Sequence, residues 1–252
     1  MIYFASDIHL GGGDAAQARR MERAFCSWLD MISADATRLY LLGDIFDFWF
    51  EYRKVVPQGF TRVLGRLAAM ADRGIEIVFY TGNHDMWCYD YLERECGMRI
   101  VRKPSVEHIG DMKLHLAHGD NMNIHGEPML KLMNATFRSS VLRWIFSWII
   151  HPDHFLGFGK WWSSKSRKSH NTEKITVERL GYLVDYAREY HKNNGDVRSY
   201  IFGHMHLPHR HTDDHIDVLF LSDWAGSKAT YATMDESYNL ELKTFDIDET
   251  IS

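Results

Sequence analysis

The sequence predicts an α/β fold with a helical cap inserted into it. Two observations support this prediction. Short apolar runs typical of buried strands alternate with amphipathic helical segments through the first hundred residues, and a long helical block then interrupts the strands. A length of 252 residues fits one domain, 1–252, with a sizeable core. A composition of 45% hydrophobic and 25% charged residues is typical of a soluble globular protein and excludes disordered or collagen-like architectures.

The first half of the chain alternates strands and helices. Such an order normally forms a parallel sheet with crossover helices, so we expect a βαβαβ unit. Gly74 follows the second helix and has the character of a helix C-cap. The predicted elements are strands at Ile2–Ser6, Arg38–Leu42 and Glu76–Tyr80, and helices at about Ala15–Ile32 and Phe60–Asp72.

The second half of the chain has shorter strands on either side of the helical block. The block interrupts the strand pattern, so we interpret it as an insertion. In chain order we predict a strand at Lys113–Ala117, a helical cap at about 122–190 with breaks near His151 and after Trp162, a strand at Arg198–Phe202, and several antiparallel strands in Leu207–Phe245.

Cysteine usage and the N-terminal residues predict a cytoplasmic protein. The three cysteines form no C-x-x-C pair, which argues against a disulfide framework or a structural zinc site. The first residues lack the basic and long apolar regions of a signal peptide. The longest apolar stretch, Val141–Ile150, is too short to cross a bilayer.

Five predicted strands end in clusters of Gly, Asp, Asn and His. Open α/β sheets gather functional side chains at the carboxyl ends of their strands, so we expect the clusters to share one site. Carboxylate, amide and imidazole groups without a thiolate favour Mn²⁺, Fe or Zn²⁺. Seven ligands are too many for one catalytic ion with an open position, and they suit two ions that share a carboxylate. The seven predicted ligands are Asp7, His9, Asp44, Asn83, His118, His204 and His206.

Each cluster taken alone also has a purely structural explanation. An isolated D-x-H is usually a strand end with a capping Asp, and Gly-Asp or Gly-Asn-His-Asp usually forms a turn. The metal hypothesis therefore depends on all five clusters occurring in order, each directly after a β-type run.

The five clusters resemble the pattern of the calcineurin-like metallophosphoesterase superfamily, D-x-H, G-D-x-x-D, G-N-H-[DE], H and G-H-x-H, over Ile2 to His206. This resemblance implies a four-layer α-β-β-α sandwich with an inserted helical cap, and a hydrolase of phosphoesters or pyrophosphates. It implies one ion held by Asp7, His9, Asp44 and His206, and a second held by Asp44, Asn83, His118 and His204, with Asp44 as the bridge.

Two cations in such a site lower the pKa of a bridging water, so that a hydroxide attacks the phosphorus in line, and they neutralise charge on the phosphoryl oxygens. By the same resemblance, His84 donates a proton to the leaving oxygen or steadies the transition state, and Asp85 orients His84. Asp47 and Asp120 are either groups that fix ligand geometry or acids of surface turns.

The predicted cap combines aromatic and basic residues. Four of the eight tryptophans lie within the nineteen residues from Trp144 to Trp162, and residues 131–174 carry eight Lys or Arg against two acidic residues. A helical subdomain that packs its own core explains the aromatic residues equally well. Together with the basic residues, they also suit a peripheral membrane contact or a lipid-phosphate pocket.

Within the superfamily, the cap and the segment Gly43–Phe50 resemble the UDP-2,3-diacylglucosamine pyrophosphatases of lipid A synthesis, which release UMP and 2,3-diacylglucosamine 1-phosphate. This implies a lipid-linked nucleotide-sugar substrate, a peripheral position on the inner face of the cell membrane, and no nucleic-acid partner. The substrate contacts implied are Asn83, His84, Arg138, Lys165, Arg167, Asn171 and Lys174. The chain departs from many proteobacterial members, which carry Arg in place of His84 and an acidic pair shortly after H-G-D.

Three alternatives remain open at this point. A nuclease or general phosphodiesterase uses the same metal motifs, but the formal charge of −5 and the dense apolar runs of the cap argue against a nucleic-acid groove. A protein phosphatase usually has G-N-H-E where this chain has Asp85. A scaffold without chemistry would show degraded ligand positions, and none of the seven is degraded.

Overall fold

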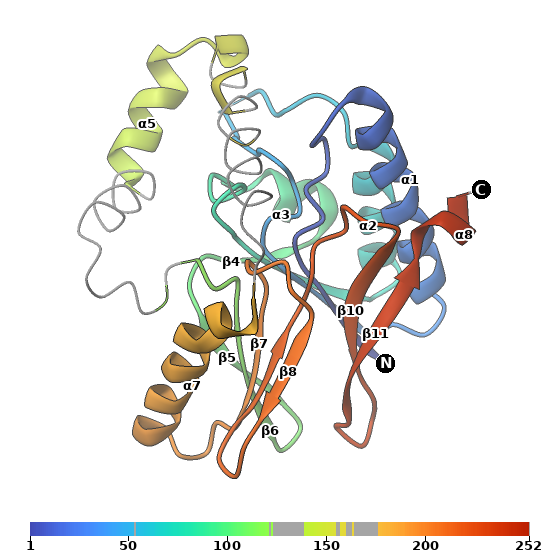
Figure 1. The fold of residues 1–252 in the computed structure, drawn as a ribbon. Helices are drawn as coiled ribbons and strands as arrows, with labels where there is room; N and C mark the ends of the chain where they lie inside the picture. Colours follow the sequence, from blue (N-terminus) through green and yellow to red (C-terminus); the bar gives the residue numbers. More distant parts are fainter. Residues whose placement is uncertain are drawn as a thin grey trace.

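The computed structural model describes residues 1–52, 54–120, 122, 139–154, 157–159, 163 and 176–251. These residues form two stacked β-sheets with helices on both outer faces, which confirms the predicted four-layer sandwich (Figure 1).

The first sheet has six strands in the order β11-β10-β1-β2-β3-β4. Its central strands β1 to β4 are parallel, and β10 and β11 add antiparallel strands at one edge. This arrangement confirms the predicted βαβαβ unit. The strands are β1 (Ile2–Ala5), β2 (Arg38–Leu42), β3 (Glu76–Tyr80), β4 (Arg99–Val101), β10 (Lys228–Met234) and β11 (Leu240–Asp246).

Helices α1 (Ala15–Ile32), α2 (Thr61–Asp72), α3 (Tyr91–Cys96) and α8 (Ile247–Ile251) belong to the layer outside the first sheet (Figure 1). Helix α1 begins with a capping box, in which Asp14 accepts from the backbone of Gln17 and the Gln17 side chain accepts from the backbone of Asp14. Its buried residues, among them Phe25 and Trp28, pack against the sheet.

The second sheet has five strands in the order β5-β6-β7-β9-β8, and α7 covers its outer face. The antiparallel pairs β8–β9 and β10–β11 confirm the prediction of several antiparallel strands after Leu207, and β9 also pairs with β7 in parallel, which was not predicted. The elements are β5 (Ser105–Ile109), β6 (Met112–Ala117), β7 (Ser199–Phe202), β8 (His209–Thr212), β9 (Asp217–Phe220), the 3₁₀ helix η1 (Val177–Leu180) and α7 (Gly181–Asn193).

Alternation along the strands divides the core into three clusters. Tyr3 and Ala5 of β1 pack towards α1, while Phe4 between them joins the cluster between the two sheets. In β7, Ile201 faces the space between the sheets, and Tyr200 and Phe202 face α7. Successive strand residues point to opposite faces, so each sheet buries both of its sides and brings its carboxyl ends to one edge.

The predicted cap is described only in part. Helix α5 (Ser140–Ile149) ends before His151, at the predicted break, and packs through Phe146 on a cluster that contains Phe50 and Trp87. A Cβ on the buried Gly159 would lie 2.3 Å from the Phe48 ring, so only glycine permits this close approach of the cap to the core. The extent of the cap, 122–190, stays a prediction; because α7 packs on the second sheet, we place the end of the insertion before η1.

Candidate metal centre

The seven predicted ligands lie in the loops that follow β1, β2, β3, β6 and β7, at the carboxyl ends of both sheets. Five of them have left-handed backbone conformations, which are uncommon for residues other than glycine. Such strain persists where the surrounding structure holds it, and it concentrates at functional sites. Their φ angles are 55° at Asp7, 50° at His9, 53° at Asp44, 67° at His204 and 51° at His206.

Two glycines of the motifs make room for the carboxylates. A Cβ on Gly82 would lie 2.2 Å from Oδ1 of Asp44, and a Cβ on Gly203 would lie 2.6 Å from Oδ2 of Asp7. The same two oxygens each accept a hydrogen bond from the backbone. The amide of His84 donates to Asp44 Oδ1 at 2.9 Å, and the amide of His204 donates to Asp7 Oδ2 at 2.9 Å. Each carboxylate therefore has one oxygen anchored to the protein and one directed to its neighbouring imidazoles.

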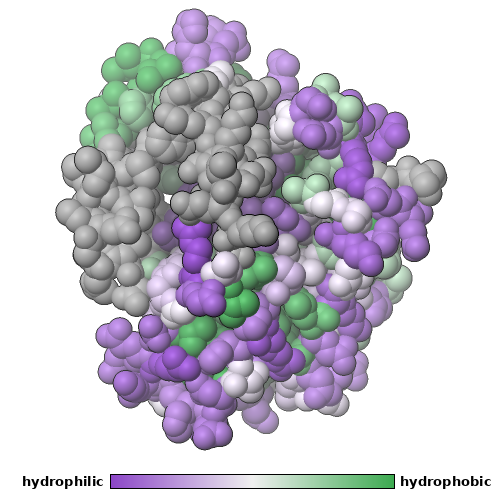
Figure 2. Space-filling view, viewed as in Figure 1, coloured by the Kyte–Doolittle hydropathy of each residue, from purple (hydrophilic) through white to green (hydrophobic). Residues whose placement is uncertain are grey.

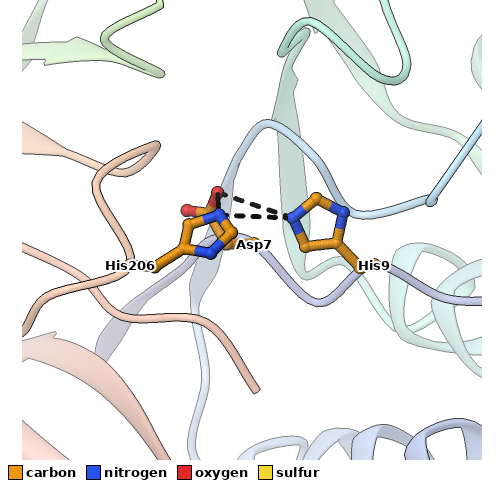
Figure 3. Close-up of side chains that lie close together, drawn as sticks. All are labelled: Asp7, His9 and His206. Atoms are coloured by element: carbon orange, nitrogen blue, oxygen red, sulfur yellow. Dashed lines mark hydrogen bonds and ion pairs between the residues drawn. The ribbon is translucent and has the colours of Figure 1, made fainter. Parts of the chain in front are cut away.

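The first group of possible metal ligands is Asp7, His9 and His206, whose side chains point towards one another (Figure 3). Nε2 of His206 lies 3.1 Å from Asp7 Oδ1 and 3.4 Å from Nε2 of His9. Although Asp7 Oδ1 lies close to the imidazole, it is buried without a hydrogen bond of acceptable geometry. A buried oxygen left in this way is a ready metal ligand, because an unpaired carboxylate oxygen is costly to bury.

The second group contains Asp44, His118 and His204, and Asn83 lies beside it. Nδ1 of His118 lies 2.9 Å from the carbonyl oxygen of Leu42, which can only accept, so this nitrogen carries the proton. Nε2 of His118 faces Asp44 Oδ2, 3.2 Å away, and Asn83 Oδ1, 3.3 Å away. Because Nδ1 is held by the backbone, Nε2 and these two oxygens are the atoms that would hold a cation.

The separations within both groups fit divalent cations. Two ligands about 2.1 Å from one ion, at an angle near tetrahedral or octahedral values, lie about 3.0–3.4 Å from each other. The pairs of possible ligand atoms given above are 3.1–3.4 Å apart. Asp44 also belongs to a third group with His9 and His84, so its carboxylate lies between the two ends of the site.

Burial and neighbouring carboxylates shift the pKa values of the four histidines in opposite directions. Burial alone would lower the pKa of His206, but Asp223 and Asp7 outweigh it and raise the pKa to about 10. Burial also opposes the charged form of His118, yet Asp44 raises its pKa well above the usual value. Burial lowers the pKa of His9 to about 3 and that of His204 to about 4.

Comparisons with known proteins agree with this geometry. A sequence profile of the family "Calcineurin-like phosphoesterase" matches residues 1–208. The chain belongs to this family. A protein of Porphyromonas gingivalis named "UDP-2,3-diacylglucosamine hydrolase" is 36% identical over 88% of this chain and 90% of its own length. A protein of the same name from Haemophilus influenzae is 24% identical over 93% of this chain and 95% of its own length. The chain is therefore a metal-dependent hydrolase.

His84 of this phosphoesterase is held by a backbone group. Its Nδ1 lies 2.8 Å from the carbonyl oxygen of Asp47, so Nδ1 carries the proton and Nε2 faces the site, 3.9 Å from Asp44 Oδ2. The prediction that Asp85 orients His84 is wrong. Asp85 is fully buried, and its carboxylate accepts from the amides of Gly82 and Ile45, so it joins the loops after β2 and β3. Sequence adjacency suggested the pairing, but the tight turn directs Asp85 away from the imidazole.

Two residues of the metal centre of the phosphoesterase were not predicted from the sequence. Asp223 lies 3.1 Å from Nδ1 of His206, an orientation that leaves Nε2 for the site. The Ser6 hydroxyl donates to Asp7 Oδ2 at 2.5 Å. Asp47, predicted either to fix ligand geometry or to be an acid of a surface turn, is buried and lies 3.6 Å from Nδ1 of His9. Ser6 directly precedes the D-x-H motif, which was an available signal, whereas Asp223 carries no motif and is brought to the site only by folding.

The predicted substrate contacts have different outcomes in the phosphoesterase. Asn83 and His84 lie at the metal centre. The cap contacts fall outside the described residues; they are Arg138, Lys165, Arg167, Asn171 and Lys174. Asp120 lies within the electrostatic reach of His118 and His204, where its negative charge opposes the burial that disfavours their charged forms.

Proposed function

We propose that the chain hydrolyses the pyrophosphate of UDP-2,3-diacylglucosamine to UMP and 2,3-diacylglucosamine 1-phosphate, a step of lipid A synthesis. The observation that carries this proposal is a near full-length match to relatives of that name in a chain whose possible ligands lie together in two groups. The match extends across the region of the cap and is not limited to the motifs that the whole family shares, since it covers 88% of the chain.

In this proposal, Asp44 bridges two cations. One ion is held by Asp7, His9 and His206 together with Asp44, and the other by Asn83, His118 and His204 together with Asp44. The presence of Asp44 in two of the three His/Asp groups supports this assignment. The donor set of carboxylates, imidazoles and an amide without a thiolate suits Mn²⁺ best, with Fe or Zn²⁺ as the other fits. When bound, such a pair of ions activates water and neutralises charge on the phosphoryl oxygens.

His84 is the residue of the chain that we assign to proton transfer. The hydrogen bond from its Nδ1 to the Asp47 carbonyl fixes the tautomer, and Nε2 is then the atom that exchanges a proton with the substrate. Its position 3.9 Å from Asp44 Oδ2 places this nitrogen beside the metal centre, where the phosphate of a substrate has to lie. When Nε2 also carries a proton, so that the ring is an imidazolium, His84 donates that proton to the leaving phosphate oxygen or steadies negative charge in the transition state.

Helix α5 provides the contact with the lipid in this proposal. Its residues Val141, Trp144, Trp148 and Ile149 are all more than half exposed, and they form an apolar surface that Figure 2 shows at the upper left. Apolar exposure of this kind is unusual on a soluble surface and marks an interaction site. We infer that this surface rests on the inner face of the cell membrane, from which the diacylated substrate is taken. Among the described residues, none of the helices combines the length and apolar character needed to span a bilayer.

The test compares three substrates with one preparation of Mn²⁺-loaded protein: UDP-2,3-diacylglucosamine in mixed micelles, bis-p-nitrophenyl phosphate, and single-stranded DNA. We expect release of UMP from the lipid-linked substrate at a kcat/KM at least about a hundredfold above that for the small diester, because contacts remote from the reacting bond raise kcat/KM. Chelation should abolish release, and added Mn²⁺ should restore it. Robust cleavage of DNA without release of UMP would replace this proposal with a nuclease.

A further inference from the structure

A cavity of about 210 Å³ opens beside the metal centre, between the carboxyl ends of the two sheets. The first sheet contributes Thr81, Val101 at the end of β4 and the segment 102–104 that follows it, and the second sheet contributes 117–120, including His118. One end of the cavity is therefore formed by a residue of the metal centre. Pockets that enclose a whole small ligand usually measure about 300–1,000 Å³, so this cavity is of a size that holds part of a larger ligand.

The walls of the cavity combine apolar surface with two cations. Val101, Ala117 and Met122 supply the apolar surface, and Arg102 and Lys103 supply the positive charges. The Arg102 guanidinium is anchored, because Nη2 donates to the carbonyl oxygens of Cys88 at 3.1 Å and Tyr89 at 2.7 Å. Lys103 is exposed and forms no ion pair with an acidic side chain among the described residues. Its charge is available to a ligand.

The combination of apolar surface and positive charge argues against binding of two parts of the proposed substrate in this cavity, the acyl chains and the sugar phosphate. An acyl chain would gain nothing from Arg102 and Lys103, and the volume is too small for two chains. A bare sugar phosphate would not use the apolar wall. A nucleoside monophosphate uses both features, because its phosphate pairs with the cations while its ring covers apolar surface.

We propose that this cavity binds the nucleoside monophosphate half of the substrate, with its phosphate at Arg102 and Lys103 and its base and ribose against Val101, Ala117 and Met122. Asp120, on the same wall, supplies a carboxylate that accepts from ribose hydroxyls. The inference rests on the proposed function, since it divides that substrate between two places. The nucleotide lies between the sheets, and the diacylated sugar lies on the side of α5.

The decisive variant is Lys103→Glu, because Lys103 has no role in holding the loop. The probes are UMP, which carries the phosphate, and uridine, which lacks it, each titrated calorimetrically into the metal-loaded protein. We expect the Kd of UMP to rise about tenfold or more and the Kd of uridine to change less than about twofold, since a single charge-assisted contact is lost. Lys103→Arg keeps the charge and should restore the wild-type Kd of UMP.

Two further measurements distinguish the phosphate of the nucleotide from that of the lipid, and this inference from the proposed function. Product inhibition by UMP should weaken in Lys103→Glu, whereas inhibition by 2,3-diacylglucosamine 1-phosphate should not. Arg73→Ala removes an exposed charge beyond the end of α2 and should change neither. Failure of wild type to release UMP would refute the proposed function. If wild type releases UMP, three results would overturn this inference alone. They are an unchanged Kd of UMP in Lys103→Glu, a loss of inhibition confined to 2,3-diacylglucosamine 1-phosphate, and no saturable binding of UMP by wild type.

Discussion

The metal centre and helix α5 place their characteristic residues in opposite ways. At the metal centre, side chains that are polar by nature are buried: Asp7 is fully buried, Asp44 is 2% exposed and His118 is 3% exposed. On α5, residues that are apolar by nature are exposed, with Trp144 at 58% and Ile149 at 75%. Both arrangements cost free energy in the isolated chain, so each indicates something that the chain binds.

The difference also lies in what holds the two regions. The metal centre is built on strand ends of both sheets, and its carboxylates are fixed by backbone amides such as that of His204. Helix α5 packs through Phe146, and the chain directly after it through Ile150, on the small cluster around Trp87. We infer that the chemistry depends on the scaffold of the family, whereas the insertion supplies selectivity for a lipid.

Asp44→Ala is the strongest test of the metal centre. Asp44 belongs to both ends of the site, so its loss should remove both ions and lower kcat/KM for every phosphoester by at least about a thousandfold. Metal content measured on the purified variant, together with turnover of bis-p-nitrophenyl phosphate, checks this. Asp72→Asn, at the exposed end of α2, serves as the charge-matched control. An Asp44→Ala protein that keeps two ions and its activity would disprove the shared bridge.

A second test concerns His115, a buried histidine within β6 that, unlike His118 three residues later, does not belong to the metal centre. His115 lies among Tyr186, Tyr190 and Tyr200, and burial lowers its pKa to about 4. An unfolded histidine titrates near pH 6.5, so the unfolded chain binds the extra proton first, and stability falls as the pH decreases from 6.5 towards 4. At pH 5 the loss from His115 amounts to about 2 kcal/mol relative to pH 7.5.

Urea unfolding of chelator-treated protein at several pH values measures this loss. His115→Phe, which keeps an aromatic ring among the tyrosines, should show a pH dependence smaller by about 2 kcal/mol between pH 7.5 and 5. His108→Asn removes an exposed histidine of β5 and should leave the wild-type slope unchanged. Equal slopes in wild type and His115→Phe would show that His115 is not held neutral by burial.

The sequence was sufficient to predict the regions whose signals are local. Apolar runs followed by clusters of Gly, Asp, Asn and His placed β1, β2, β3, β6 and β7, and the loops after β2, β3 and β6 bring Asp44, Asn83 and His118 together. The register of β9 was not predictable, because its pairing with β7 depends on the hairpin that places β8 outside it.

Contacts that depend on tertiary folding could not be predicted from the sequence. Asp223 reaches His206 from a loop after β9, and the Asp47 carbonyl, a backbone atom with no side-chain signature, holds the His84 ring. The cavity at Arg102 and Lys103 arises only where the ends of the two sheets meet. A pattern of residue types predicts which side chains share an edge, but it does not predict which atom each one faces.

The smallest predicted effect concerns the exposed surface of α5. Trp144 and Trp148 have ring centroids 5.6 Å apart and are 58% and 54% exposed, so the pair can insert its apolar area into a membrane interface without moving the core. Trp144→Ser/Trp148→Ser should weaken binding to anionic vesicles about tenfold, measured by co-sedimentation, because removal of this area loses more than 1 kcal/mol of transfer free energy.

Met31→Ser removes an exposed apolar residue of α1 as the control and should bind vesicles like wild type. Turnover of vesicle-borne UDP-2,3-diacylglucosamine should fall further than turnover of a soluble diester. If both activities fall equally, α5 supports the fold and the lipid contact lies elsewhere, and the contrast between a buried chemical centre and an exposed lipid surface no longer holds for this helix.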